Sequence, residues 1–400
     1  MELRGRSKGS RARVVTGLTL LLALGGGLAA GVFPGQPGGE GFAPGTHVVL
    51  GTNDLGMHCM QQDYADFLVL PPYNTLHAQV IRRGQSPEII EGDITVTYMF
   101  GENTRSADKV NFWDYAPALF GVTVPPNVGL TGSRLRGTMT RTANKDWAVT
   151  GIPITPIRDD GREDAYQLAT ITAQQGSTVL ARTQAVVPVS WEIGCNLCHG
   201  GPTESVGDSV LRLHDQLHQT TLSSQRPVNC SACHADPALG APGVPGVSTF
   251  SAAMHGAHAD RPPPPGVQNS CYACHPGERT DCQRDLHASR GLTCTDCHGG
   301  MVDVGSPLRT PWVDVPKCGG CHTRAGFEFE EPGKLFRESR GHGGVTCLAC
   351  HGSPHAMGPA VTTIDNHQAM VQQDMTGPIR NCLVCHTSQP EDPFPHRRDD

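Results

Sequence analysis

The stretch GHGGVTCLACHGSPHA, residues 341–356, contains the pattern that decides how the second half of this chain folds. The pattern is C-x-x-C-H, here Cys347 to His351. It occurs seven times, at 195–199, 230–234, 271–275, 294–298, 318–322, 347–351 and 382–386. Every C-x-x-C pair in the chain is followed directly by histidine, so the histidine belongs to the pattern.

C-x-x-C-H is the attachment site of c-type haem. Two thiols three positions apart can form thioethers with the two vinyl groups of one porphyrin, and the next residue places an imidazole against the iron. The motifs predict seven covalent haems on Cys195, Cys198, Cys230, Cys233, Cys271, Cys274, Cys294, Cys297, Cys318, Cys321, Cys347, Cys350, Cys382 and Cys385. The predicted proximal iron ligands are His199, His234, His275, His298, His322, His351 and His386.

Three other uses of cysteine explain the pattern less well. Zinc ribbons pair C-x-x-C motifs, but zinc does not require histidine at the next position every time. A disulfide framework does not need such uniform spacing. A thioredoxin-like redox motif occurs once, within a βαβ unit.

The haems are also expected to form the core of residues 191–400. This half holds 15 of the 16 cysteines and 16 of the 19 histidines, and it provides about 30 residues for each motif. Proline and glycine interrupt it every few residues, so an ordinary apolar core is not available. We therefore predict a loop-rich, mainly short-helix multihaem domain that needs its cofactor to fold.

Histidines between the motifs are the candidates for the sixth position on each iron. There are eight of them for seven haems: His214, His218, His255, His258, His287, His342, His355 and His367. His214 and His218 compete at positions i and i+4, and His396, after the last motif, ranks lower. Methionine is the alternative ligand and would raise the potential of its haem. An iron with two histidines has no open position, which favours electron transfer over catalysis.

Residues 46–190 differ in composition and predict a β-sandwich. Short runs rich in Thr, Val and Ile lie at 46–50, 77–82, 94–100, 166–173 and 184–190, with turns expected at 159–161 and 175–176. Alternation in 94–100 is typical of a half-buried strand. Several short strands joined by short connections favour antiparallel sheets.

The N-terminal sequence is typical of an export signal. Five basic residues in 1–13 precede the apolar stretch 14–30, and a Gly/Pro-rich linker follows at 31–45. An uncleaved membrane anchor is the alternative, because 14–33 is near the length of a membrane span. Either reading places the rest of the chain outside the cytoplasm, in the periplasm or at the cell surface.

Two cysteines, Cys59 and Cys282, lie outside the motifs. Each could be a buried thiol or half of a disulfide that joins the two halves. A thiolate ligand to haem, or copper binding by the run Met57 to Met60, is the functional alternative.

Residues 191–400 resemble the multihaem c-type cytochromes of metal-reducing and related bacteria. The resemblance is carried by CYACHPG (271–277), CTDCHGGM (294–301) and residues 341–356. It implies respiratory electron transfer between redox proteins or to an extracellular acceptor, and a β-domain that docks partners. A net charge of −7 argues against a nucleic-acid partner and favours a basic protein patch, a metal cation or an oxide. A multihaem oxidoreductase of the nitrite, hydroxylamine or tetrathionate type, with one haem open to substrate, and a haem-filament subunit stay open as alternatives.

Overall fold

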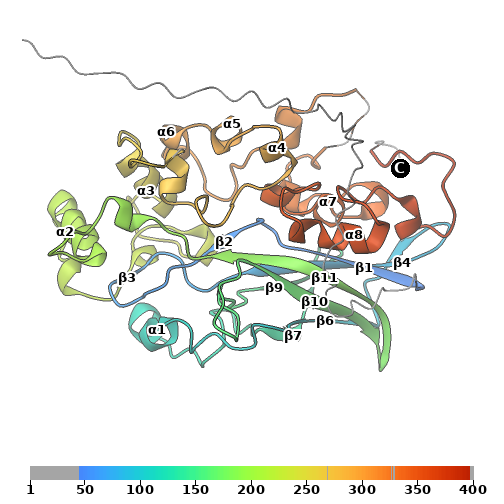
Figure 1. Ribbon diagram of the computed structural model, residues 1–400, viewed down its shortest axis with the longest axis horizontal. Helices are drawn as coiled ribbons and strands as arrows, with labels where there is room; N and C mark the ends of the chain where they lie inside the picture. The colour runs from blue at the N-terminus through green and yellow to red at the C-terminus, as the bar shows by residue number, and fades with distance from the viewer. Residues whose placement is uncertain (1–44, 268, 326, 328, 397–400) are drawn as a thin grey trace, which may run out of the picture. The chain divides into compact units, whose positions relative to one another are not determined.

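The N-terminal part of the chain forms β-sheets from the segments that the sequence predicts. Figure 1 shows the computed structural model, which describes residues 45–396 except 268, 326 and 328. The five predicted strands are present as β1 (His47–Thr52), β4 (Thr75–Arg82), β6 (Thr95–Phe100), β10 (Tyr166–Gln175) and β11 (Thr178–Ser190). Their ends differ from the predicted ones by at most two residues, except that β11 begins six residues earlier than predicted. The predicted turn at 175–176 joins β10 to β11, and Gly176 adopts the left-handed conformation there (φ 56°).

These strands belong to two five-stranded sheets. In the first, β1, β4, β9 (Trp147–Thr150) and β8 (Thr140–Arg141) follow in order, and β5 (Glu88–Ile89) pairs with β4. In the second the order is β2 (His58–Cys59), β11, β10, β6 and β7 (Arg136–Thr138). The pairings are antiparallel, as expected, except for the two-residue pairing of β2 with β11.

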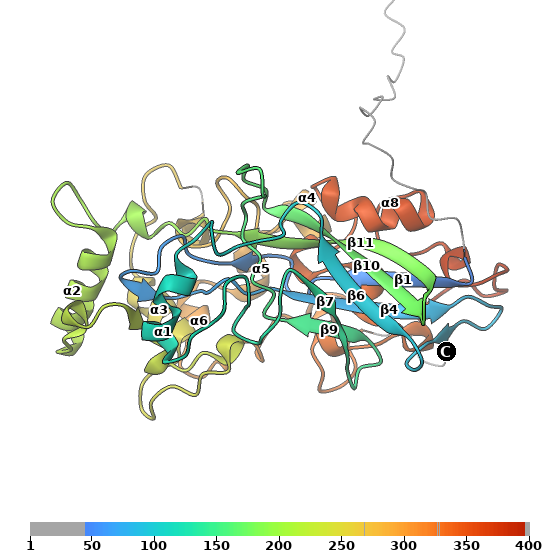
Figure 2. The same cartoon turned by 90° about the horizontal axis from the view of Figure 1, so that it is seen from below.

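Side chains from both sheets fill one hydrophobic core. Val49 and Val80 of the first sheet and Ile171 and Val187 of the second are fully buried in it. The nine-residue helix α1 (Phe112–Phe120), visible in Figure 2, adds Phe112 to this core. Helix α1 is not evident from the sequence, because it is short and contains Pro117.

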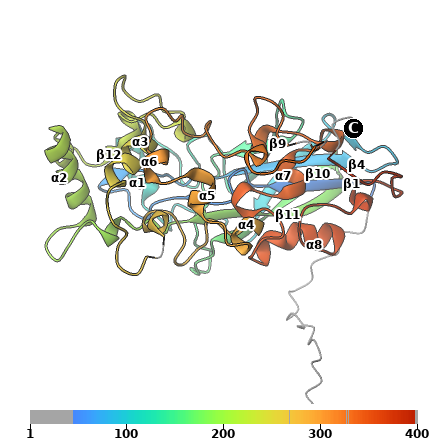
Figure 3. The same cartoon turned by 90° about the horizontal axis from the view of Figure 1, so that it is seen from above.

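The C-terminal part is rich in loops and short helices, as predicted. Figures 1 and 3 show its helices side by side along the sheets, with α7 beside β1 and α8 beside β11. They are α2 (Val206–His218), α3 (Phe250–His258), α4 (Leu286–Ser289), α5 (Cys294–His298), α6 (Met301–Val304), α7 (Cys347–His351) and α8 (His367–Gln373). Among the described residues, six apolar side chains are buried after residue 190, compared with 33 before it. This half therefore has little apolar interior of its own.

The two halves are in direct contact. The described residues, 45–396 with the three gaps given above, belong to one compact unit. The backbone N–H of Gly51 donates to Gln368 Oε1 (2.7 Å), and β12 (Val228–Asn229) pairs with β3 (Phe67–Leu68). The predicted export signal, residues 1–30, and the predicted linker up to residue 44 lie outside the described residues. Within the described part of the chain, we find no helix that is long and apolar enough to cross a membrane.

Candidate metal centres

Each C-x-x-C-H motif folds as one helical turn. Two motifs form the short helices α5 and α7, and the other five are 3-10 turns. In those five, the backbone N–H of the histidine donates to the carbonyl of the first cysteine, at 2.8–3.0 Å. Positions i, i+3 and i+4 of a helical turn share one face. The two thiols and the imidazole therefore leave the backbone on the same side, as one porphyrin requires.

Every motif histidine faces a second histidine from elsewhere in the chain. We call these contacts the seven imidazole pairs. They are His199–His258, His234–His214, His275–His255, His298–His355, His322–His287, His351–His396 and His386–His342. Their ring centroids are 5.7–6.3 Å apart.

This separation fits one metal ion between the two rings. A metal–imidazole bond is about 2 Å long and a ring nitrogen lies roughly 1.2 Å from the ring centre, so two rings on opposite sides of one ion are about 6.4 Å apart. Two imidazoles supply only two ligands, and among residues 45–396, where described, no three or more His, Cys, Asp or Glu side chains gather around a common point. A porphyrin would supply the four remaining nitrogens.

Hydrogen bonds at Nδ1 leave Nε2 of these rings available for a metal. Seven of the paired histidines have Nδ1 within 2.7–2.9 Å of an oxygen acceptor, which fixes the tautomer. The acceptors are Thr220 Oγ1 for His214, Ser248 O for His234, Ser251 O for His255, Met254 O for His258, Asp285 Oδ2 for His287, Leu55 O for His355 and Gln85 O for His386.

Burial also keeps several motif imidazoles uncharged. Loss of solvent, reinforced by neighbouring histidines, lowers the pKa of His275, His298 and His351 to about 4 each. Neutral imidazole is the form that binds metal. At neutral pH these three side chains are therefore ready to act as ligands without losing a proton.

Six of the eight histidines predicted for the sixth position lie in the imidazole pairs. The other two do not face a motif histidine. The ring of His218 lies 4.9 Å from that of His214, and Nε2 of His367 is 3.0 Å from Gln184 Oε1. The seventh partner is His396, whose ring stacks on Phe327 at 5.9 Å. Its position after the last motif gave no sign that the chain returns to 347–351.

The sixteen cysteines carry no disulfide in the structure. Cys59 and Cys282 are near neighbours, because loop 276–284 packs on the end of β11. Ser190, the last residue of β11, pairs with Cys59 of β2, and its Oγ lies 2.7 Å from Thr280 Oγ1 in that loop. Burial raises the pKa of Cys282 to about 11, and burial together with Cys282 raises that of Cys59 further. Both thiols are therefore protonated at neutral pH in the absence of a metal.

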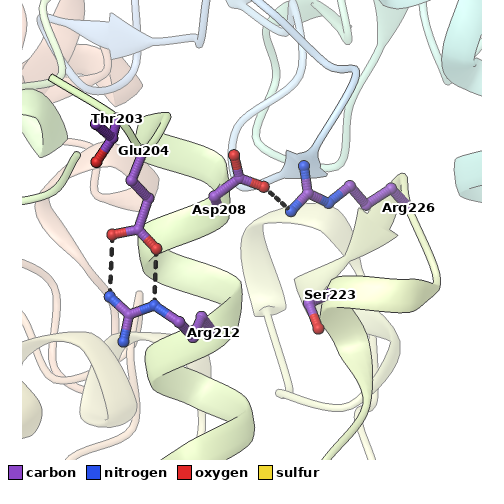
Figure 4. Close-up of a pocket in the computed structure, with 6 residues that line it drawn as sticks. All are labelled: Thr203, Glu204, Asp208, Arg212, Ser223 and Arg226. Carbon is purple, nitrogen blue, oxygen red and sulfur yellow. Dashed lines mark hydrogen bonds and ion pairs between the residues drawn. The ribbon is translucent and has the colours of Figure 1, made fainter. Parts of the chain in front are cut away.

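Figure 4 shows a polar pocket beside α2. It is lined by Thr203, Glu204, Asp208, Arg212, Ser223 and Arg226. Glu204 accepts two hydrogen bonds from Arg212, at 2.7 and 3.0 Å, and Asp208 pairs with Arg226. The charged side chains of this pocket thus satisfy one another, and we assign it no chemistry.

No family model, curated protein or solved structure matches this chain. Its function is therefore inferred from its residues and their geometry.

Proposed function

We propose that this protein is an exported c-type cytochrome that carries seven covalent haems and relays electrons between redox partners. One observation carries the proposal: each of the seven motifs faces its own second histidine, at the separation that one iron between two imidazoles needs. When bound, haem supplies an iron that alternates between the ferrous and ferric states.

The residues of the chain hold and tune the group. The paired thiols of each motif would tether the porphyrin, and the two imidazoles would bind its iron and keep other ligands out. Hydrogen bonds at Nδ1 hold seven of these rings in place and adjust their basicity, which is one way a protein sets a haem's potential. With both positions filled, the centres suit electron transfer rather than substrate binding.

Contacts between motifs support a relay. The thiols of Cys271 and Cys294, from the third and fourth motifs, lie close enough to shift each other's pKa. Ala349 and Val384, from the sixth and seventh motifs, share one small hydrophobic cluster. Groups attached at such neighbouring motifs would be close together, as transfer from one to the next requires.

The proposal also accounts for the small apolar core of the C-terminal half. Seven porphyrins would fill the space between its loops, against one face of the β-sheets, which we interpret as a sandwich. Respiratory redox proteins or an extracellular acceptor are the proposed partners, and the periplasm or cell surface is the proposed location.

Haem content and spin state test this proposal. Pyridine haemochrome analysis and intact mass should give seven haems per chain, and low-temperature EPR should show only low-spin ferric signals. Replacing Cys318 and Cys321 by Ala should lower the count to six, whereas the same change at Cys59 and Cys282 should leave seven. A colourless, folded protein with bridged or zinc-bound thiols would refute the proposal. A high-spin signal that shifts with nitrite or hydroxylamine would instead favour the oxidoreductase.

A further inference from the structure

One turn of the β-sheet half touches the segment that carries His355. The carbonyl of Leu55 accepts a hydrogen bond from His355 Nδ1 (2.9 Å). The carbonyl of Asn53, two residues earlier, accepts one from Ser353 Oγ (2.7 Å). Two carbonyls of one turn therefore hold the segment that carries His355, 300 residues further along the chain.

The turn is itself firmly held. Asn53 is buried, and its Nδ2 donates to Asn74 Oδ1 and to the carbonyl of Thr75, both at 2.7 Å. Its Oδ1 accepts from the backbone N–H groups of Leu55 (3.0 Å) and Gly56 (2.7 Å). A short polar side chain that bonds its own following backbone fixes the course of a turn. The position of the Leu55 carbonyl is thus set by the sheet.

Gly56 allows the close approach of the two segments. Its φ is +88°, a conformation that side chains other than glycine rarely adopt. A Cβ placed on Gly56 would lie 3.1 Å from both Cβ and N of His355. Any larger residue there would press directly on the histidine.

We propose that residues 53–56 are a positioning element that holds the His355 imidazole on the face of the fourth motif's haem opposite to His298. The inference rests on the proposed function, since it concerns the sixth ligand of that haem. It gives the β-sheet half a role inside the haem centres, beyond the docking of partners. Residues 53–56 touch no reacting group themselves, and they act through His355.

The element also links two centres. His355 follows His351, the proximal ligand of the sixth motif, by four residues, and Gly358 N–H returns to the His351 carbonyl (3.0 Å). The segment 351–358 is therefore short and closed on itself. Fixing it at residues 353 and 355 fixes the distal ligand of one haem relative to the proximal ligand of another.

A pair of glycine substitutions tests the proposal on the full-length holoprotein. Gly56→Ala should convert one of the seven haems from low-spin to high-spin in the EPR spectrum, with the signal that His355→Ala produces. Gly161→Ala is the matched control, because Gly161 has a similar φ (+84°) but nothing lies within 4 Å of its added Cβ. It carries comparable backbone strain and should leave all seven haems low-spin.

Ser353→Ala provides a milder variant if Gly56→Ala does not fold. It removes the hydrogen bond from Ser353 Oγ to the Asn53 carbonyl. Losing a hydrogen bond of typical strength should raise the fraction of molecules in which His355 is displaced from the iron about fivefold. Carbon monoxide should then bind the reduced protein about fivefold more readily than wild type, at one haem only. If Gly56→Ala matches Gly161→Ala, or Ser353→Ala binds carbon monoxide like wild type, the positioning role is wrong while the haem assignment stands. A wild-type protein without haem would instead refute the proposed function.

Discussion

The buried ion pair between Arg284 and Asp365 should be among the most sensitive points of the fold. The side chains are 1% and 4% exposed, and the guanidinium meets the carboxylate through Nε (2.6 Å) and Nη2 (2.8 Å). Its Nη1 donates to the carbonyl of Gly56 (2.5 Å), so one side chain ties together three distant segments. Replacing Arg284 by Met keeps most of the volume but leaves the Asp365 carboxylate buried without its counter-ion.

The expected loss is large because an uncompensated buried charge remains. Breaking such a pair costs about 3–5 kcal/mol of unfolding free energy. Guanidinium unfolding of the holoprotein, followed by far-UV circular dichroism, measures this loss. Arg82→Met is the control: Arg82 and Glu88 are 57% and 60% exposed, and an exposed pair contributes only about 0–1 kcal/mol.

The double variant Arg284→Met/Asp365→Leu separates the charge effect from lost packing. With both charges gone, most of the stability should return, because apolar replacements of a buried pair are often neutral. The reasoning would be refuted if Arg284→Met cost no more than Arg82→Met, or if the double variant were less stable than Arg284→Met alone.

Three further outcomes follow from the imidazole geometry and its surroundings. His396→Ala should turn one haem high-spin in the EPR spectrum, whereas His367→Ala should turn none. The reverse result would mean that His367, and not His396, is the second ligand of the sixth motif's haem. Asp285→Asn should raise the midpoint potential of one haem in a spectroelectrochemical titration. The reason is that a neutral amide in place of the carboxylate makes the His287 imidazole a weaker electron donor. An unchanged potential would contradict this. Burial opposes the charged form of His77, but the Asp146 carboxylate outweighs it and raises the pKa of His77. The stabilisation by this pair is complete below about pH 6.5 and is lost as pH rises through the raised pKa of His77. The difference in unfolding free energy between wild type and His77→Gln should therefore shrink from about pH 5.5 to about 8.5. A constant difference would contradict the assignment.

The sequence predicts the local features of this protein well. Alternation of apolar residues, as in Val96, Tyr98 and Phe100, is enough to predict a strand, because one face of the sheet is buried. The C-x-x-C-H spacing likewise places two thiols and an imidazole on one side of a turn without any long-range information.

The partner of each motif is a long-range feature and could be predicted only in part. Counting the histidines between motifs gives candidates, but their pairing depends on how the loops cross. His367 has the expected spacing, yet its Nε2 meets Gln184, whereas His396 reaches the sixth motif. The turn at residues 53–56 shows the same limit, because nothing in its sequence points to a segment 300 residues away.

The seven imidazole pairs also differ in the order in which their two histidines are synthesised. Synthesis runs from the N-terminus, and for four motifs the second histidine has already been made when the motif emerges. For the first, fourth and sixth motifs it comes 59, 57 and 45 residues later, as His258, His355 and His396. If haem is attached while the exported chain emerges N-terminus first, these three centres would lack their second histidine until the following 45–59 residues arrive.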